Sequence, residues 1–426
     1  MNNTTFLEKL LDGAEVEWVA LGKVAEKISS GGTPKTGISE YYDGEIPWLR
    51  TQEVDFGEIW DTGVRITEEG VDNSSARWIP ANCVIIAMYG ATVGKIGINK
   101  IPMTTNQACA NIQLNEDTLN FRYLFHLLCS KYEYIKSLGS GPQTNINAGI
   151  VKKLQIPIPC PENPEKSLAI QAEIVRILDT FTELTAELTA ELTAELTARK
   201  KQYNYYRDQL LTFEDGEVAW KPLGQVISNL RTGLNPRKNF KLNPQGATNS
   251  YVTVRELGGF DLVISEKTDR VNNEGLALIQ RRSKLQAGDV LFSATGTIGR
   301  TALIAEQPKD WNIKEGVYAI TPVPALLNSR FLIYLLQSTK IRRKFLASAD
   351  GSVVASVSMA SFRKLEIPVP ALAEQARIVA ILDKFDTLTH SISEGLPREI
   401  ELRQNQYEHY RDLLLNFPKK QTEGVA

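Results

Sequence analysis

The amino-acid sequence repeats itself once along its 426 residues, and this repetition limits the possible folds more than any other property. Trp18-Val-Ala-Leu-Gly-Lys-Val returns as Trp220-Lys-Pro-Leu-Gly-Gln-Val. Near the end of each copy, Gln171-Ala-Glu-Ile-Val-Arg-Ile-Leu-Asp matches Gln375-Ala-Arg-Ile-Val-Ala-Ile-Leu-Asp. Because each copy of about 200 residues is long enough for a domain with its own core, the sequence predicts two tandem copies of one fold.

Each copy opens with a globular region that we predict to be mixed, mostly β. Cys83-Val-Ile-Ile-Ala-Met and Asp289-Val-Leu-Phe-Ser-Ala are short apolar runs before glycine-containing turns, which is typical of buried strands. Residues 121–138 and 330–346 have the pattern of single amphipathic helices. Pro-x-Pro pairs at 157/159 and 368/370 mark the exit from each region, since proline continues neither a helix nor a central strand.

Each copy ends in a predicted helix of roughly 44 residues, over 168–211 and 372–415, each about 65 Å long. Helices of this length need an extended partner, so the sequence predicts that they pair with each other as an antiparallel coiled coil. Gly395 and Pro397 predict a kink in the second helix. The residues expected to pair are Ile174, Leu178, Leu188, Leu192, Leu196, Ile378, Leu382, Ile392 and Leu396.

The predicted fold class is therefore α+β, with two domains joined by two long antiparallel helices. The expected organisation is an N-terminal arm (1–17), a first domain (18–160), a central helix (161–217), a second domain (218–370) and a C-terminal helix with a tail (371–426). The arm carries Leu10-Leu11, and Leu210-Leu211 precedes the second domain in the same way. This echo predicts a near-circular arrangement with a pseudo-two-fold axis.

The first long helix contains Thr-Ala-Glu-Leu three times, from Thr185 to Leu196. Each tetrapeptide adds about 6 Å to a helix and rotates one end by about 40°. The plain interpretation is a solvated helix segment; the sharper hypothesis is a unit that sets a length. Glu187, Glu191 and Glu195 form an outward row that would repel DNA or face a partner.

Charge separates the two domains. The whole chain has a formal charge of −2. Residues 18–160 hold 13 Lys and Arg against 14 Asp and Glu, whereas residues 220–370 hold 21 against 11. A local basic field attracts a polyanion whatever the total charge is. Four widely spaced cysteines, no signal-peptide pattern and no apolar run of membrane-spanning length predict a cytoplasmic protein with reduced thiols.

Catalytic motifs are not found in the sequence. Gly90-Ala-Thr-Val-Gly-Lys95 resembles a phosphate-binding loop, but it is one residue short and lacks the following Ser or Thr. No dinucleotide-binding glycine motif or base-flipping methyltransferase motif is present. The histidines do not repeat: His126 aligns with Tyr334, and we expect no second candidate group beside it. We therefore predict a non-catalytic chain with no metal site.

The order of several short motifs resembles the specificity (S) subunits of type I restriction-modification systems. These motifs are Ser30-Gly-Gly-Thr-Pro34, Ile46-Pro-Trp48, Thr92-Val-Gly-Lys95, Thr105-Asn-Gln107, Ile156-Pro-Ile-Pro159 and the run from Gln171 to Asp179. The resemblance covers nearly the whole chain, and the Thr-Ala-Glu-Leu repeats resemble the IC class.

This resemblance implies that each globular region is a target recognition domain that reads one half of a bipartite double-stranded DNA sequence. It implies that the helices set the gap and dock two modification (methyltransferase) subunits, and that two restriction subunits join for cleavage. S-adenosylmethionine, ATP and Mg²⁺ would belong to those partners, with no cofactor in this chain and no membrane association.

Base contacts require polar side chains on loops that enter the major groove. The candidates, all in or beside glycine- or proline-bounded turns, are Lys35, Arg50, Gln52, Lys95, Gln143, Asn145, Arg231, Arg237, Lys238, Arg255 and Arg300. Such turns can instead contact phosphates, which position without specifying. The run Arg342-Arg-Lys344 is expected to be a phosphate-facing helix surface.

Two other classes remain open from the sequence. One is a non-catalytic coiled-coil scaffold with two protein- or glycan-binding domains, which the basic second domain disfavours. The other is a methyltransferase–specificity fusion, which the missing cofactor and base-flipping motifs disfavour. A salt titration of DNA binding separates a scaffold from a DNA reader, because only the reader shows a steep salt dependence.

Overall fold

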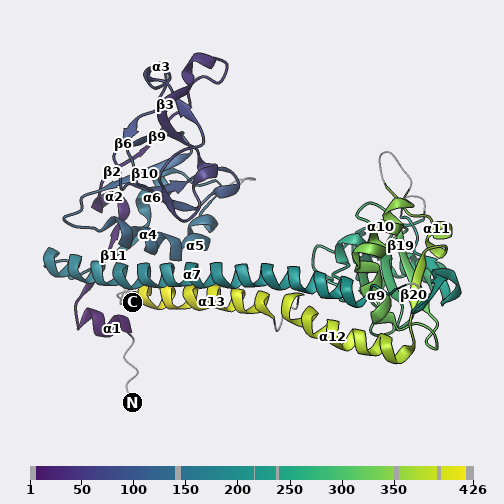
Figure 1. Ribbon diagram of the computed structural model, residues 1–426. Coiled ribbons are helices and arrows are strands. Elements are labelled where there is room, and N and C mark those ends of the chain that lie inside the picture. The colour runs from purple at the N-terminus through teal and green to yellow at the C-terminus, as the bar shows by residue number, and fades with distance from the viewer. Residues whose placement is uncertain are drawn as a thin grey trace. The chain divides into compact units, whose positions relative to one another are not determined.

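The computed structural model describes residues 6–139, 145–214, 216–236, 239–349, 355–390 and 395–418. The chain divides into two compact units (Figure 1). The first unit contains Met1–Glu191 and Ile400–Ala426, and the second contains Leu192–Glu399. Both ends of the chain therefore belong to the first unit, and each long helical segment is shared between the units.

The first unit is built on two small mixed sheets and a two-stranded ribbon. One sheet has the order β2-β10-β7-β8-β4 and the other β5-β3-β9-β6, with β1 paired to β11. The strands are β1 (Val16–Ala20), β2 (Ala25–Ser30), β3 (Tyr42–Leu49), β4 (Glu58–Ile59), β5 (Arg65–Ile66), β6 (Trp78–Ile79), β7 (Val84–Ala87), β8 (Ile96–Asn99), β9 (Met103–Thr105), β10 (Cys109–Leu114) and β11 (Gln155–Pro159). Its helical segments are α1 (Phe6–Leu11), α2 (Leu21–Val24), η1 (Ser39–Tyr41), η2 (Thr51–Glu53), α3 (Glu68–Asp72), η3 (Gly90–Thr92), α4 (Phe121–Ser130), α5 (Tyr132–Ser137) and α6 (Ala148–Lys153).

The second unit repeats this topology with fewer strands. Its sheets have the orders β13-β19-β16-β17 and β15-β14-β18, with β12 paired to β20. The strands are β12 (Ala219–Pro222), β13 (Ile227–Thr232), β14 (Asn249–Val252), β15 (Arg270–Val271), β16 (Val290–Ser293), β17 (Thr301–Leu303), β18 (Trp311–Ile313), β19 (Val317–Pro322) and β20 (Glu366–Val369). Its helical segments are η4 (Leu223–Gln225), η5 (Val254–Glu256), α8 (Asn273–Ser283), α9 (Ser329–Gln337), α10 (Thr339–Ala347) and α11 (Met359–Arg363).

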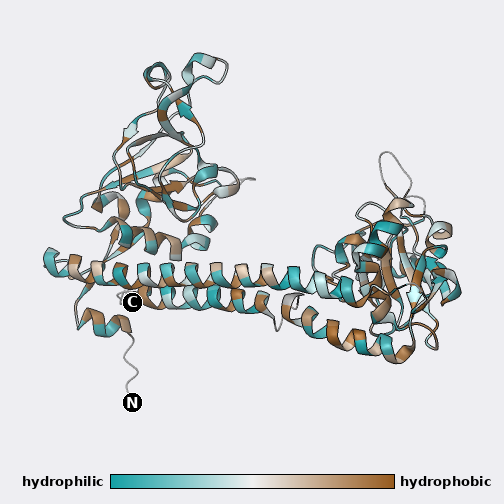
Figure 2. Ribbon diagram, viewed as in Figure 1, coloured by the Kyte–Doolittle hydropathy of each residue, from teal (hydrophilic) through white to brown (hydrophobic). Residues whose placement is uncertain are grey.

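Strand pairing confirms the predicted repetition and the α+β class. β10 lies antiparallel between β2 and β7, as β19 lies between β13 and β16. β3 pairs with β9 in parallel, as β14 does with β18. In Figure 2 the hydrophobic residues gather in these strands, and β7 and β16 are buried along their whole length.

Two predicted single helices are wrong: each is a pair of helices. α4 and α5 replace the helix expected over 121–138, and α9 and α10 replace the one over 330–346. Ser338 interrupts the second pair because it has extended backbone angles. The break lets α4 and α9 keep their apolar faces on the sheet. It also lets Ile135 of α5 and Ile341 of α10 be buried in the core.

The central long helix, α7 (Pro164–Leu210), has 47 residues and begins four residues earlier than predicted. Pro164 suits the first helical position, because it has no N–H to leave unpaired. Asn163 lies just before it, and its side chain accepts a hydrogen bond from the Lys166 N–H at 3.0 Å. The described parts of the second long helix are α12 (Leu372–His390) and α13 (Leu396–Leu415), and the predicted kink at Gly395 and Pro397 falls at the start of α13.

Each unit contains its own helix pairing. In the first unit Phe181 of α7 stacks on Tyr410 of α13, with ring centroids 5.8 Å apart. In the second unit Tyr206 of α7 stacks on Phe385 of α12 at 5.7 Å. Within the first unit, the Thr182 hydroxyl lies 2.9 Å from the Tyr407 hydroxyl, so partner numbers fall as α7 numbers rise, as expected of antiparallel helices.

The stripe residues divide into groups. Ile174 and Leu178 enter the core of the first unit, and Ile378 and Leu382 that of the second. Leu192 and Leu396 are buried, and Leu188 and Leu196 are half-buried. Ile392 lies outside the described residues. Leu184 is 58% exposed, because a leucine every fourth residue drifts off the packed face of a helix.

Candidate nucleic-acid interface

A glycine turn between β7 and β8 organises the candidate site of the first unit. Gly90 and Gly94 adopt φ values of +82° and +83°, which favour glycine. The Thr92 hydroxyl donates to the Thr51 carbonyl at 2.8 Å and ties the turn to η2. On the other side, the Ile146 N–H donates to the Met88 carbonyl at 3.0 Å and ties it to the loop before α6.

The second unit builds the same arrangement between β16 and β17. Gly296 and Gly299 have φ values of +76° and +96°. The turn contacts η5 through Arg300, whose Nη1 donates to the Val254 carbonyl at 3.4 Å. It contacts the loop before α11 through the Val357 N–H, which donates to the Ala294 carbonyl at 2.9 Å. We call this set of three neighbouring loops the glycine-turn cluster of each unit.

The clusters bring together several of the predicted DNA-binding residues. In the first unit they place Gln52, Lys95 and Asn145 around one turn, with Gln52 exposed. In the second unit they place Arg255 beside Arg300, and both are exposed. Side chains on adjacent loops can address neighbouring bases or phosphates, so these residues form a coherent candidate surface.

Acidic neighbours modulate these cations. Lys95 Nζ lies 2.6 Å from Asp55, and Arg50 Nε lies 3.3 Å from Glu53. Arg255 pairs with Asp269 at 2.8 Å but stays 59% exposed. A cation in such a pair must exchange a carboxylate for a phosphate before it can bind DNA.

Other candidates lie elsewhere. Lys35 is exposed on the loop after β2, which is held by the Trp48 indole donating to the Gly32 carbonyl at 2.9 Å. The Tyr42 hydroxyl donates to the Pro34 carbonyl at 2.7 Å on the same loop. Gln143, Arg237 and Lys238 lie outside the described residues.

The placement of Arg231 corrects the prediction for this residue. Its guanidinium lies 2.6 Å from Asp289, and the two side chains are 10% and 0% exposed. It also donates to the Lys284 carbonyl and to the Thr321 hydroxyl. Burial raises the pKa of Asp289 although Thr321 and Arg231 stabilise its charged form. Arg231 therefore balances a buried carboxylate inside the domain, and we remove it from the set proposed to contact bases.

A repeated ion pair anchors each domain to its long helix, and the sequence analysis missed it. Arg122 of α4 donates to Asp179 of α7 through Nε at 2.7 Å and Nη2 at 2.8 Å. Arg330 of α9 contacts Asp383 of α12 in the same way, at 2.8 Å. The matching positions of both partners in the two copies were a signal that could have revealed the pair.

His126 also differs from its prediction. It is buried, and its Nε2 lies 2.7 Å from Asp179, so a second titratable group does lie beside it. Tyr334, at the matching position, donates to Asp383 at 2.6 Å. Both side chains complete the hydrogen bonding of the anchoring carboxylate, and this explains why a histidine and a tyrosine can replace each other here.

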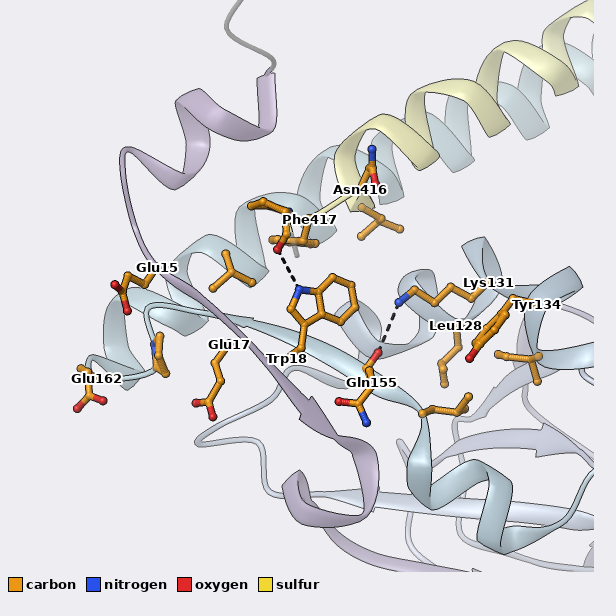
Figure 3. A pocket seen from close by; sticks show the side chains of 16 residues that line it. Glu15, Glu17, Trp18, Leu128, Lys131, Tyr134, Gln155, Glu162, Asn416 and Phe417 are labelled. Carbon is orange, nitrogen blue, oxygen red and sulfur yellow. Dashed lines mark hydrogen bonds between the residues drawn. The ribbon is translucent and has the colours of Figure 1, made fainter. Parts of the chain in front are cut away.

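A pocket of about 1280 Å³ in the first unit is unsuited to DNA. Figure 3 shows Trp18 between Phe417 and Lys131, with the acidic side chains of Glu15, Glu17 and Glu162 together on one side of it. The Trp18 indole donates to the Pro418 carbonyl at 2.9 Å, and Lys131 Nζ lies 4.4 Å from the indole ring. Three carboxylates would repel phosphates.

Metal-binding clusters and membrane-spanning helices are absent from the described part of the chain. No cluster of three or more His, Cys, Asp or Glu side chains there is arranged to hold a metal ion. No helix there combines the length and apolar character needed to cross a membrane.

Comparison with known proteins identifies the class. A family model described as the type I restriction modification DNA specificity domain matches residues 14–198 and again residues 219–402. The two matches cover both repeats, with their glycine-turn clusters and the first parts of their long helices. The chain belongs to the family of type I restriction-modification specificity subunits.

Individual relatives are similar over their whole length. The chain is 36% identical to the EcoR124I/EcoR124II specificity subunit of Escherichia coli, covering 99% of each chain. It is 34% identical to the EcoprrI specificity subunit of Escherichia coli, covering 92% of this chain and 93% of the relative. A chain solved in work on assembly and conformational transition of the type I R-M system has a TM-score of 0.66 at 17% identity, covering 94% of this chain and 97% of that one. The HsdS subunit from Thermoanaerobacter tengcongensis has a TM-score of 0.51 at 18% identity, covering 94% and 95%. The structural matches support the fold.

Proposed function

We propose that this specificity subunit reads a bipartite double-stranded DNA target, with one half-site for each recognition domain. The observation that carries the proposal is the duplicated glycine-turn cluster, which presents polar and cationic side chains once in each unit: Gln52, Arg255 and Arg300 are exposed, and Lys95 and Asn145 are half-buried. The first domain offers Gln52, Lys95 and Asn145, and the second offers Arg255 and Arg300. Because the two sets differ, the two half-sites are expected to differ in sequence.

The helices α7, α12 and α13 would set the gap between the half-sites and dock two modification subunits, with two restriction subunits joining for cleavage. The chain itself would be non-catalytic and cytoplasmic. S-adenosylmethionine, ATP and Mg²⁺ would bind to the partner subunits. This division of labour agrees with the lack of catalytic motifs in the sequence.

The test is adenine methylation across the source genome, with the gene intact and deleted. A split motif with a fixed gap should disappear on deletion and return on complementation. Exchange of residues 218–370 for the corresponding domain of a relative should then change one half-site and leave the other intact. If a co-expressed modification subunit methylates the same motif with and without this chain, the proposal is wrong.

A further inference from the structure

The two recognition domains differ in charge at the helix that packs against the glycine turn. In the second domain this helix is α10, which carries Lys340, Arg342, Arg343 and Lys344 and has no acidic residue. In the first domain it is α5, where Glu133 offsets Lys136. α10 and α5 occupy matching positions in two copies of one fold, so their difference in charge distinguishes the two domains.

Packing fixes which side chains of α10 face outward. Ile341 and Phe345 point into the core, where the Phe345 ring packs edge-on against Phe292 with centroids 5.1 Å apart. Lys340 and Lys344 lie over the Trp220 ring, at 4.9 and 4.3 Å from its centroid. Arg342 and Arg343 are left exposed.

Arg342 also lies beside the glycine turn. A Cβ placed on Gly299 would lie 3.8 Å from Arg342 Nη1 and 3.0 Å from the Phe345 ring. Arg300, the next residue, is exposed, and its guanidinium donates only to the Val254 carbonyl among the described residues. Within the described part of the chain, no carboxylate pairs with Arg300, Arg342 or Arg343. Arg342 therefore lies beside the turn that carries Arg300, and Arg343 follows it on the exposed side of α10.

The matching place in the first domain is neutralised. A Cβ on Gly94 would lie 3.3 Å from the Tyr132 ring, so an aromatic side chain stands near the turn. Lys95, the counterpart of Arg300, lies 2.6 Å from Asp55 and 5.7 Å from the centroid of the Phe56 ring. Phe56 in turn packs on Tyr132. Lys95 is therefore held by an ion pair and an aromatic contact, whereas its counterpart Arg300 has no carboxylate partner among the described residues.

We propose that Arg300, Arg342 and Arg343 form a phosphate-binding surface, here called the α10 surface, which makes the second recognition domain the main electrostatic anchor on DNA. This inference rests on the proposed function and adds a division of work between the domains. The phosphodiester backbone is the fitting partner, because a guanidinium binds phosphate oxygens in a two-pronged geometry and duplex DNA presents them densely. Its two arginines on α10, Arg342 and Arg343, supply affinity without sequence preference, and Arg300 lies where this surface meets the loops proposed to read bases.

The test uses the full chain assembled with its modification subunits, a duplex of arbitrary sequence and a duplex carrying the methylated motif. R342Q/R343Q should lower the steepness of log affinity against log salt by about 2, since each lost phosphate contact removes about 0.9. The loss of affinity at 50 mM salt should then exceed the loss at 200 mM about tenfold. The ratio of affinities for the two duplexes should stay unchanged.

Two control variants keep the result interpretable. R342K/R343K keeps the charge and should keep a salt slope near that of the unsubstituted complex. E133Q/K136Q alters the matching helix of the first domain without changing net charge and should leave the slope unchanged.

An R342Q/R343Q complex that binds DNA with an unchanged slope would overturn the α10 surface alone. A selective change at one half-site would assign these arginines to base reading, and weakened subunit assembly would assign them to an acidic protein face; either result overturns the proposal. An unsubstituted complex that binds neither duplex would overturn the proposed function and the surface with it.

Discussion

At the scale of single residues, the repeated positions are explained by close backbone contacts and by half-buried ion pairs. Gly31 and Gly233 occupy matching positions after β2 and β13, and a Cβ on either would overlap with a backbone carbonyl, of Thr105 or Ile313. The ion pairs Arg122–Asp179 and Arg330–Asp383 are repeated in the same way. These residues hold the domains together and leave the exposed loops free to vary.

Replacing either glycine by alanine should therefore destabilise its own unit. Gly31→Ala and Gly233→Ala each force backbone atoms apart, which is expected to cost about 3 kcal/mol of unfolding free energy. Gly37→Ala is the control, because a Cβ at this position would meet no other atom within 4 Å, and a change below about 0.5 kcal/mol is expected. Denaturant unfolding monitored for each unit by hydrogen exchange measures both. Equal stability of Gly31→Ala and Gly37→Ala would contradict the argument.

Acid should weaken the anchor of the first domain. Burial alone would raise the pKa of Asp179, but hydrogen bonds from His126 and Arg122 outweigh it and lower this pKa below its ordinary value. Its contribution is therefore present at neutral pH and is lost as the pH falls below about 4. Asp179→Asn should cost about 2 kcal/mol at pH 7 and less at pH 3. Glu183→Gln, at an exposed site of the same helix, is the control; a pH-independent cost for Asp179→Asn would refute this assignment.

At the scale of elements, α7 combines two kinds of segment. Its ends carry Ile174, Leu178 and Tyr203, which are buried in the domain cores. Its middle carries the Thr-Ala-Glu-Leu repeats, whose glutamates Glu187, Glu191 and Glu195 are exposed. A middle segment whose residues are outside both domain cores can change length while each end keeps its packing, which is what a length-setting unit requires.

Deletion of Thr189–Leu192 should shorten the gap in the methylated motif by one or two base pairs. The reason is that four residues span about 6 Å of helix, whereas one base pair spans about 3.4 Å. Glu191→Gln keeps the length and should keep the gap. Methylation sequencing of strains that carry either variant gives the result directly. An unchanged gap in a deletion strain that still methylates would exclude the length-setting hypothesis.

At the scale of the whole molecule, the first unit is completed by both ends of the chain. Leu7 and Leu11 of α1 share a core with Leu414, Leu415 and Phe417. The second unit fills the matching place with one continuous segment, in which Leu211 and Phe213 are buried. The N-terminal helix α1 and the end of α13 therefore pack together within the first unit, as the predicted near-circular arrangement requires. The first domain consequently depends on residues from the opposite end of the chain.

Phe417→Ala should therefore destabilise the first domain although it lies near the C-terminus. Phe417 is 3% exposed and packs against Tyr123 with ring centroids 6.2 Å apart. Loss of a buried phenylalanine is expected to cost about 3–4 kcal/mol. Phe213→Ala is the reciprocal control and should affect the second domain instead. Domain-resolved hydrogen exchange distinguishes them, and protection lost in the second domain on Phe417→Ala would argue against this dependence.

The sequence alone determined the duplication, the α+β class, the long helices and the family. Each of these properties depends on patterns that recur over many residues, such as apolar periodicity and repeated motifs. A change of any one residue therefore leaves the pattern recognisable. The sequence also named Gln52, Lys95, Asn145, Arg255 and Arg300, since glycine-bounded turns are visible locally.

Tertiary structure decided which of these charges are free. Arg231 and Arg300 look alike in the sequence, yet one balances Asp289 inside the domain and the other is exposed beside Arg342. Likewise, the breaks at α4–α5 and α9–α10, the Asp179 and Asp383 anchors and the exposure of Leu184 depend on partners distant in sequence. The free energy of a charge or an apolar side chain is set by its surroundings, and only the folded chain brings those surroundings together.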